Sequence, residues 1–461
     1  MIFSSSISAR AVWPALAGKI KVAGWAAVLG LASGLACVAV RLAFRMLQWV
    51  FVQQTGFLPH AAATLSPERR VITPFLGAAL ATAVLWIVKR WANPARFQEY
   101  VDAVHHHDGR IPFSSTLWRT VSSAFSVATG AAIGREGSMI QFATAVTSWL
   151  GEHSPLRAVS LSRQVSYGVA AAVAAAYQAP IAGVFFATEI VLGEWVWTEI
   201  PALALASVAG GLVSRLLLGA GPLFAVQTTL RFNASALWAL PLALLLGCIG
   251  PLYQRLLRSV QVARRLPVAL LWGGLFVGLL SLLRPGVWGN GDVALMNALA
   301  GTPALGSVVF LLLIRLLATT ACVGVGTVGG VFTPTLFAGA SFGLIAGYLL
   351  HVDQPVLLAI AGLSALLAAV THAPFMASLM AVELTGQYQL LPLLLAINLG
   401  AWLVASSISP RSLYAASLQT SLPACAGLSP ARPSLAHETI HLEPSRPNPH
   451  PIDSRKLTAD S

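Results

Sequence analysis

Gly134-Arg135-Glu136-Gly137-Ser138 lies between two apolar segments, at roughly 117–133 and 139–150. An arginine and a glutamate at membrane depth cost free energy and usually serve a function. The two glycines let the backbone turn closely, and Ser138 is placed to cap the helix that follows. The stretch predicts a helix N-terminus whose bare N–H groups face an anion, with a carboxylate beside it. A charged loop tip at the surface is the alternative that these five residues leave open.

The composition is that of an integral membrane protein. Of the 461 residues, 56% are hydrophobic and only 10% are charged, whereas a soluble domain carries about 25% charged residues. Many apolar runs reach about 20 residues, enough for a helix to span a bilayer. Readable strands are few, so we expect an all-α bundle that crosses the membrane many times, and not a barrel. The formal net charge of +12 indicates basic cytoplasmic loops, with no nucleic-acid partner.

We expect three parts along the chain. A cytoplasmic N-terminal segment at 1–21 precedes a membrane domain at 22–415. Basic residues near the start favour a cytoplasmic N-terminus. After about residue 407 the composition shifts to proline, serine, histidine and charge, which predicts a disordered cytoplasmic tail at 416–461.

An internal repeat divides the membrane domain. In both halves an Ala-Pro pair is followed by a glutamate nine residues after the proline: Glu189 follows Pro180, and Glu383 follows Pro374. Short, interrupted apolar segments in matched positions indicate a transport site between two repeated halves. The halves cover about 73–218 and 234–406.

The glycine-rich helix start also recurs. The offset between the two glutamates, added to Glu136, leads to Gly330 within Gly329-Gly330-Val331-Phe332-Thr333-Pro334. Backbone N–H groups at two helix starts carry partial positive charge. They would hold an anion less tightly than a full cationic charge, which suits conduction because the ion must also leave.

A rival interpretation comes from Gly339-Ala340-Ser341-Phe342-Gly343. It fits the GxSxG pattern of a serine nucleophile, and His351 and His372 are near in sequence. An intramembrane serine hydrolase is therefore an alternative function. The competing interpretation is a helix contact through the small residues Gly339 and Gly343, with no enzyme activity.

No metal site or disulfide framework is expected. His105-His106-His107-Asp108 is read as a solvated loop, because adjacent ligands on a regular helix cannot all face one ion. The four cysteines form no CxxC pair.

Three ordered motifs resemble the anion-site motifs of the CLC chloride channel and transporter family. They are Gly134-Arg135-Glu136-Gly137, Gly330-Val331-Phe332-Thr333-Pro334 and Ser412-Leu413-Tyr414. The segments from Gly329 to Leu336 and from Thr385 to Pro392 are similar to a bacterial branch of the family, the ClcB type.

The resemblance, which runs from about residue 22 to residue 415, implies the architecture. It implies short, tilted and broken helices in two inverted repeats, and a homodimer with one anion pore per subunit. It also implies a multi-pass protein of the bacterial inner membrane with both termini cytoplasmic. Chloride would be the transported ligand, without a cofactor.

The resemblance assigns roles residue by residue. Glu136 is the gating residue, whose carboxylate occupies an anion site until protonation or chloride displaces it. Val331 and Phe332 offer backbone N–H groups to the central ion, Tyr414 offers its hydroxyl, and Arg135 supports the motif. The full anion-binding set is Gly134, Arg135, Gly137, Gly330, Val331, Phe332 and Tyr414.

Two departures from the family pattern bear on mechanism. Pro94-Ala95-Arg96-Phe97-Gln98 stands where the family has Gly-Ser-Gly-Ile-Pro, so the serine contact to the ion is lost. Proton-coupled members carry a glutamate where this chain has Ile190. Ile190 cannot relay a proton, which favours passive chloride conduction. The resemblance to the ClcB type further implies that this conduction serves as an electrical shunt in acid stress. A proton-coupled chloride antiporter is the alternative.

Glu189 is next to Ile190 but does not replace a proton relay there. A helical neighbour lies about 100° around the axis and faces elsewhere. We expect Glu189 and Glu383 to be structural carboxylates in matching positions of the two halves.

Overall fold

Helices make up nearly all of the chain that the computed structural model describes, namely residues 9–91, 97–156, 159–227, 230 and 234–414. These residues contain 17 α-helices and no β-strand, only an isolated β-bridge between Gly134 and Gly330. The prediction of an all-α protein is confirmed. The expected tail at 416–461 lies outside the described residues.

The first half begins with a helix longer than expected. Helix α1 starts at Ala9 and not near Val22, so most of the expected N-terminal segment is helical. Short helices follow, as the breaks by glycine, proline and charge predicted. The elements are α1 (Ala9–Val52), α2 (Leu58–Thr64), α3 (Pro67–Trp91), α4 (Tyr100–His106), α5 (Phe113–Ala128), α6 (Glu136–Glu152), α7 (Leu161–Tyr177), α8 (Pro180–Phe186), which continues into the π-helical turn η1 (Ala187–Leu192), and α9 (Ile200–Leu218).

The second half repeats this alternation of long and short helices. The elements are η2 (Ala234–Trp238), α10 (Ala239–Ser259), η3 (Val260–Arg265), α11 (Ala269–Leu283), η4 (Pro285–Val287), α12 (Asp292–Leu299), α13 (Leu305–Gly324), α14 (Phe332–Leu349), α15 (Pro355–Thr371), α16 (Pro374–Thr385), η5 (Tyr388–Leu390) and α17 (Leu391–Ile408).

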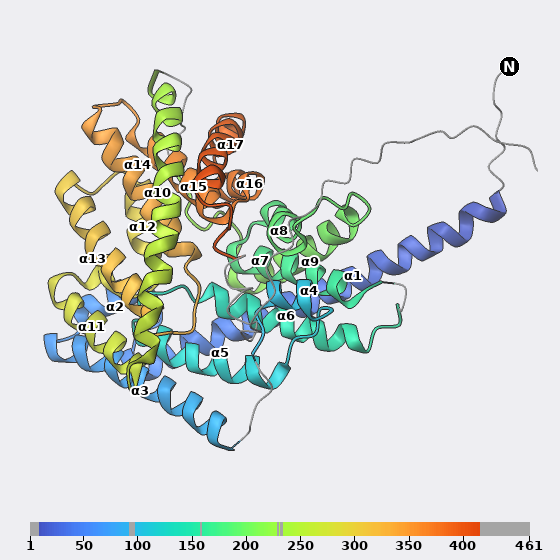
Figure 1. Ribbon diagram of the computed structural model, residues 1–461, viewed down its shortest axis with the longest axis horizontal. Helices are drawn as coiled ribbons and strands as arrows, with labels where there is room; N and C mark the ends of the chain where they lie inside the picture. Colours follow the sequence, from blue (N-terminus) through green and yellow to red (C-terminus); the bar gives the residue numbers. More distant parts are fainter. Residues whose placement is uncertain (1–8, 92–96, 157–158, 228–229, 231–233, 415–461) are drawn as a thin grey trace, which may run out of the picture. The chain divides into compact units, whose positions relative to one another are not determined.

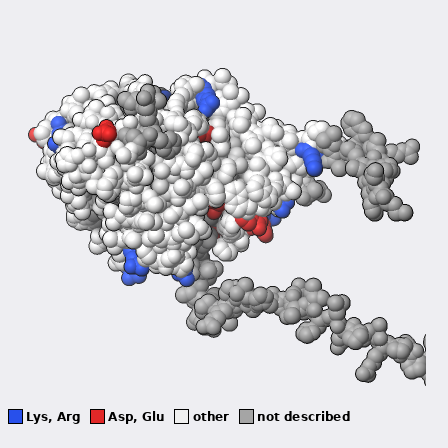
Figure 2. Space-filling view, turned by 90° about the horizontal axis from the view of Figure 1, so that it is seen from above, with Lys and Arg blue, Asp and Glu red and all other residues white. Residues whose placement is uncertain are grey.

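Apolar side chains cover much of the surface. Within the described residues, seven helices are long and apolar enough to cross a membrane, and many of their large apolar side chains are exposed. Figure 2 shows a face on which charged side chains are few and scattered. In water such a surface would be unstable, but a lipid bilayer satisfies it. The chain is a multi-pass membrane protein.

The two halves share backbone conformations as well as sequence. The helix before each Ala-Pro pair ends in a left-handed residue, Gln178 at φ 56° and ψ 33° and His372 at φ 58° and ψ 31°. The alanines that follow, Ala179 and Ala373, adopt φ −121° and −125° with ψ 76° in both. A non-glycine residue with positive φ is uncommon, so its recurrence supports a genuine structural repeat.

Packing is tightest where small residues meet. Helix α14 packs along α15, and α1 packs along α7 and α9 (Figure 1). A Cβ added to Gly343 of α14 would lie only 1.9 Å from the carbonyl oxygen of Leu358 in α15. A Cβ at Gly339 would lie 2.4 Å from the carbonyl oxygen of Gly362. Glycine therefore lets these two helices touch backbone to backbone.

Gly343→Ala tests this contact. The added methyl group must push α14 from α15, so we expect the unfolding free energy to fall by about 1–3 kcal/mol. The measurement is the thermal unfolding midpoint of the detergent-purified protein. Gly306→Ala in α13 is the control, because a Cβ there meets nothing within 4 Å. Equal midpoints for the two variants would contradict the close packing.

Candidate functional site

Two glycine-rich loops, one from each half, join through a reciprocal pair of backbone hydrogen bonds. The N–H of Gly134 donates to the carbonyl of Gly330 at 2.7 Å, and the N–H of Gly330 donates back to Gly134 at 2.8 Å. A Cβ on Gly134 would stand 2.8 Å from the Gly330 oxygen, and one on Gly137 would stand 2.8 Å from the Gly330 Cα. The two loops can therefore approach this closely only because these positions are glycine.

This pairing brings the starts of α6 and α14 together. Helix α6 begins at Glu136, directly after one loop, and α14 begins at Phe332, directly after the other. The first-turn N–H groups of a helix have no acceptor within the helix. Neither N-cap residue, Arg135 or Val331, caps its helix with a side-chain hydrogen bond. Two sets of N–H donors with partial positive charge are thus concentrated in one place, which suits an anion.

The Glu136 carboxylate is buried beside these helix starts. The residue is 4% exposed. Its Oε1 accepts a hydrogen bond from the Asn290 amide at 2.8 Å, and the Nε of Arg135 lies 3.6 Å from the same oxygen. Its Oε2 is buried and has no hydrogen-bond partner among the described residues. The charged loop tip at the surface that the sequence left open does not describe this glutamate.

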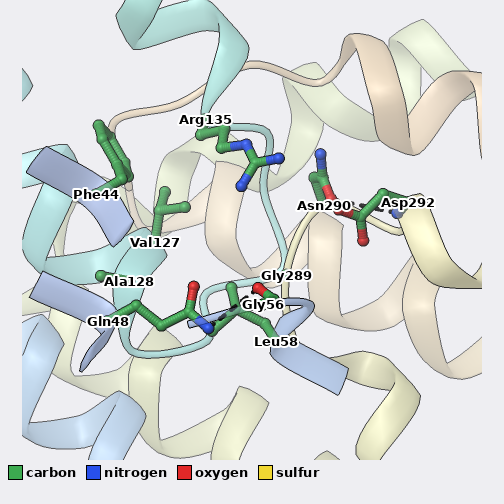
Figure 3. Close-up of a pocket in the computed structure, with 10 residues that line it drawn as sticks. All are labelled: Phe44, Gln48, Gly56, Leu58, Val127, Ala128, Arg135, Gly289, Asn290 and Asp292. Atoms are coloured by element: carbon green, nitrogen blue, oxygen red, sulfur yellow. Dashed lines mark hydrogen bonds between the residues drawn. The ribbon is translucent and has the colours of Figure 1, made fainter. Parts of the chain in front are cut away.

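Arg135 and Asn290 also line a small pocket. Figure 3 shows the Arg135 guanidinium extending toward the side on which Asn290 and Asp292 lie. Glu136 does not line this pocket, but two lining residues, Arg135 and Asn290, contact its carboxylate. The lining residues are Phe44, Gln48, Gly56, Leu58, Val127, Ala128, Arg135, Gly289, Asn290 and Asp292.

An aromatic cluster borders the start of α14. The Phe332 ring centroid lies 5.0 Å from that of Tyr177 and 6.4 Å from that of Phe186. Phe186 in turn lies 5.9 Å from Tyr414, whose hydroxyl is hydrogen-bonded to Tyr100. The structure therefore brings Tyr414 to the same region as Phe332, although the two are far apart in sequence. That the Tyr414 hydroxyl binds an ion stays a prediction.

The repeated glutamates each cap a helix in the opposite half. The Glu383 carboxylate accepts two hydrogen bonds from the first turn of α8, at 3.0 and 2.7 Å. The Glu189 carboxylate accepts two from the first turn of α16, at 3.3 and 2.7 Å. Each carboxylate satisfies N–H groups that the membrane could not. The donors are Ile181 and Ala182 for Glu383, and Phe375 and Met376 for Glu189.

Ile190 follows Glu189 in the π-helical turn η1. Its side chain is buried and offers no group that can bind a proton. The carboxylate of Glu189 is occupied by α16 instead.

One local expectation is wrong. Ser138 does not cap α6, because that helix begins two residues earlier and Ser138 falls in its first turn. Its hydroxyl donates to Ser123 at 2.6 Å, and the Ser123 hydroxyl donates to the Val328 carbonyl at 2.6 Å. Ser138 thus links α5, α6 and the second glycine-rich loop.

His105 and His106, expected in a solvated loop, are exposed residues at the end of helix α4. The Nδ1 atoms of His106 and His107 approach the carboxylate of buried Asp102, at 3.1 and 3.6 Å. Burial lowers the pKa of His105. Nowhere among the described residues do three metal-ligating side chains gather as a metal ion needs.

Two further sequence features, Ser341 and the stretch at the position of the family's first anion motif, complete the comparison with the expected site. The Ser341 hydroxyl is buried and donates its proton to the Phe337 carbonyl one turn earlier in α14, at 2.8 Å. Of the stretch that replaces the family's first anion motif, residues 94–96 lie outside the described residues. Phe97 stacks under Arg119, with 4.0 Å between the guanidinium carbon and the ring centroid.

Asn290 is the site residue that sequence reasoning missed. It follows Gly289 in a glycine-rich turn and lies 154 residues from Glu136. The only signal available was a polar residue between two glycines in an apolar chain.

Comparison with known proteins agrees with this geometry. The family model described as "Voltage gated chloride channel" matches residues 77–406. This chain belongs to that family, the CLC family. It is 35% identical over 405 residues to "Voltage-gated ClC-type chloride channel ClcB" of Citrobacter koseri, covering 84% of this chain and 97% of that protein. It is 36% identical over 406 residues to the protein of the same name from Salmonella typhimurium, again covering 84% and 97%.

Solved CLC structures share the fold. The structure of "a slow cyanobacterial Cl-/H+ antiporter" matches with a TM-score of 0.75 at 24% identity, over 87% of this chain and 97% of that one. The structure of "a CLC-type fluoride/proton antiporter" matches with a TM-score of 0.67 at 19% identity, over 87% and 98%. The resemblance to the CLC family and its fold is confirmed. The chain is a CLC chloride channel or transporter.

Substitution of Glu383 tests the capping of α8. Glu383→Leu removes both acceptor oxygens and leaves two N–H groups buried, which costs about 1–3 kcal/mol each. Glu383→Gln keeps one acceptor oxygen and should lose less. The measurement is the thermal unfolding midpoint of the purified protein, with exposed Glu194→Leu as the control. An unchanged midpoint for Glu383→Leu would refute the capping role.

Proposed function

We propose that this CLC protein conducts chloride passively through a pore that Glu136 gates. The observation that carries the proposal is the position of the Glu136 carboxylate, buried at the junction of two helix starts that suit an anion. An ionised carboxylate and a chloride ion are both anions and compete for the same N–H groups. Protonation neutralises the carboxylate and weakens its hold on the site. The anion would then meet the N–H groups of Val331 and Phe332, with Tyr414 on the aromatic side.

The buried Ile190 supports passive conduction. A relay needs a group that binds and releases a proton, and an aliphatic side chain does neither. The relatives named as voltage-gated chloride channels favour the same conclusion. The second candidate, a proton-coupled chloride antiporter, is favoured by two solved proteins that share the fold, a cyanobacterial Cl-/H+ antiporter and a fluoride/proton antiporter.

The resemblance to the CLC family implies the setting that we propose for the protein. We place it in the inner membrane as a homodimer, with a pore in each subunit and both termini in the cytoplasm. The shunt function in acid stress follows only from the resemblance to the ClcB type.

Variants of Glu136 test the gate. In wild type, lower external pH should raise chloride flux, because the neutral side chain leaves the site. Glu136→Gln mimics the neutral form and Glu136→Ala removes the carboxylate, so both should give flux that is nearly independent of pH. Glu136→Asp, shorter by one methylene, should keep part of the response. Chloride efflux from liposomes over a pH series measures this, and a Glu136→Gln protein with the wild-type pH response would exclude Glu136 as the gate.

The reversal potential tests passive conduction against coupling. In a reconstituted bilayer with both a chloride and a pH gradient, the reversal potential should follow the chloride gradient alone, because Ile190 cannot pass protons. Wild type in a chloride gradient without a pH gradient is the control. Uphill proton movement driven by chloride would replace the channel with the antiporter.

A further inference from the structure

The Asn290 side chain makes the direct side-chain hydrogen bond to the Glu136 carboxylate. Asn290 is 6% exposed and Glu136 is 4% exposed, so water does not screen this contact. The amide Nδ2 and the carboxylate Oε1 are 2.8 Å apart. Hydrogen bonds to an ionised acceptor are roughly twice as strong as neutral ones. The bond therefore favours the ionised form of Glu136 in the position that the structure shows.

A second hydrogen bond determines which way the amide points. The Asn290 Oδ1 accepts from the backbone N–H of Asp292 at 3.2 Å (Figure 3). A backbone N–H can only donate, so the amide oxygen must face Asp292. The NH₂ group must then face Glu136, as a donor. Asn290 cannot turn its oxygen toward the carboxylate without losing both bonds.

The loop that carries Asn290 is itself held from within. Arg315 of α13 is 2% exposed and donates to a row of backbone carbonyls, at 2.5 Å to Gly286, 3.1 Å to Val287 and 2.9 Å to Gly289. Gly289 donates to the Gly130 carbonyl at 3.3 Å. Because both sides of the loop are tied, the Asn290 backbone cannot follow the carboxylate if it moves.

Other charged and titratable groups also face Glu136. Arg135 lies in the same loop, at 3.6 Å from Oε1. Arg41 of α1 and Tyr177 of α7 interact electrostatically with the carboxylate. Asp292 of α12 lines the pocket beside Arg135 and Asn290. These groups stay unchanged when Asn290 alone is replaced, so their contribution cancels in a comparison of variants.

We propose that Asn290 is a positioning residue of the gate: its amide stabilises the ionised Glu136 carboxylate in the blocking position and so sets the pH at which chloride flux rises. This inference rests on the proposed function of Glu136. In this proposal the neutral side chain of Asn290, from the second half of the chain, controls the carboxylate of Glu136, from the first half.

Two substitutions test the proposal in chloride efflux from liposomes over a pH series. Asn290→Leu removes the donor and keeps a similar volume, so the ionised carboxylate is less stable and protonation becomes easier. We expect the pH of half-maximal flux to rise by about one unit, the size expected for the loss of a hydrogen bond to a charged group. Asn290→Asp has nearly the shape of asparagine but puts a second carboxylate beside Glu136. Like charges at short range oppose joint ionisation, so the rise should be at least as large.

Two controls make the outcome decisive. Exposed Asn297→Asp adds the same charge to α12 without touching Glu136 and should leave the pH response unchanged. Glu136→Gln combined with Asn290→Leu should match Glu136→Gln alone, because Asn290 acts through the carboxylate. If Asn290→Leu does not fold, Asn290→Asp decides the question by itself.

Failure of the proposed role of Asn290 can be distinguished from failure of the proposed function of Glu136. If Glu136→Gln abolishes the pH response while both Asn290 variants titrate like wild type, the positioning role is wrong and the gate stands. A fall in the pH of half-maximal flux would also overturn the proposal, since it would mean that Asn290 holds the carboxylate away from the ion path. If Glu136→Gln keeps the wild-type pH response, the proposed function itself has failed.

Discussion

Unpaired backbone groups at the ends of broken helices are the constraint on which this structure depends. A bilayer offers no hydrogen bonds, so each helix that starts inside the membrane must find acceptors within the protein. Here the two halves supply them to each other. Gly134 and Gly330 exchange hydrogen bonds at the centre, and Glu189 and Glu383 each cap a helix of the opposite half. A reciprocal exchange of this kind is what a two-fold relation between halves produces.

The same constraint explains why the site can exist. The starts of α8 and α16 are closed by carboxylates from the opposite half, whereas those of α6 and α14 carry no side-chain cap. Under the proposed function a mobile anion and the Glu136 carboxylate, at the start of α6, compete for the N–H groups of these two starts. Glu136 would then be able to leave, whereas Glu189 and Glu383 stay hydrogen-bonded to the helix starts that they cap. Chemistry does not separate the two kinds of glutamate, since only their neighbours differ.

Much of this could be predicted from the sequence, and the exceptions have physical causes. Apolar runs indicated the helices, and the equal spacing of Pro180 to Glu189 and Pro374 to Glu383 indicated the repeat. The early start of α1 was missed because the basic residues near the start were assigned to a separate cytoplasmic segment, although lysine and arginine are good helix formers. The partners of Glu189 and Glu383 and the contact of Asn290 could not be predicted, because a contact between residues far apart in sequence leaves no local pattern.

The neutral character of Asn290 matters for how such a gate can open. The amide of Asn290 approaches the Glu136 carboxylate to 2.8 Å, whereas the nearest guanidinium nitrogen of Arg135 stays at 3.6 Å. A buried carboxylate in full contact with arginine is held strongly, and separating such a pair costs several kcal/mol. A hydrogen bond to a neutral amide is weaker, so the loss of one charge on protonation is enough to release it. Arg135 at the longer distance adds attraction for anions without fixing the carboxylate in place. Under the proposed function, the gate would thus depend on a hydrogen-bond donor strong enough to orient Glu136 and weak enough to release it.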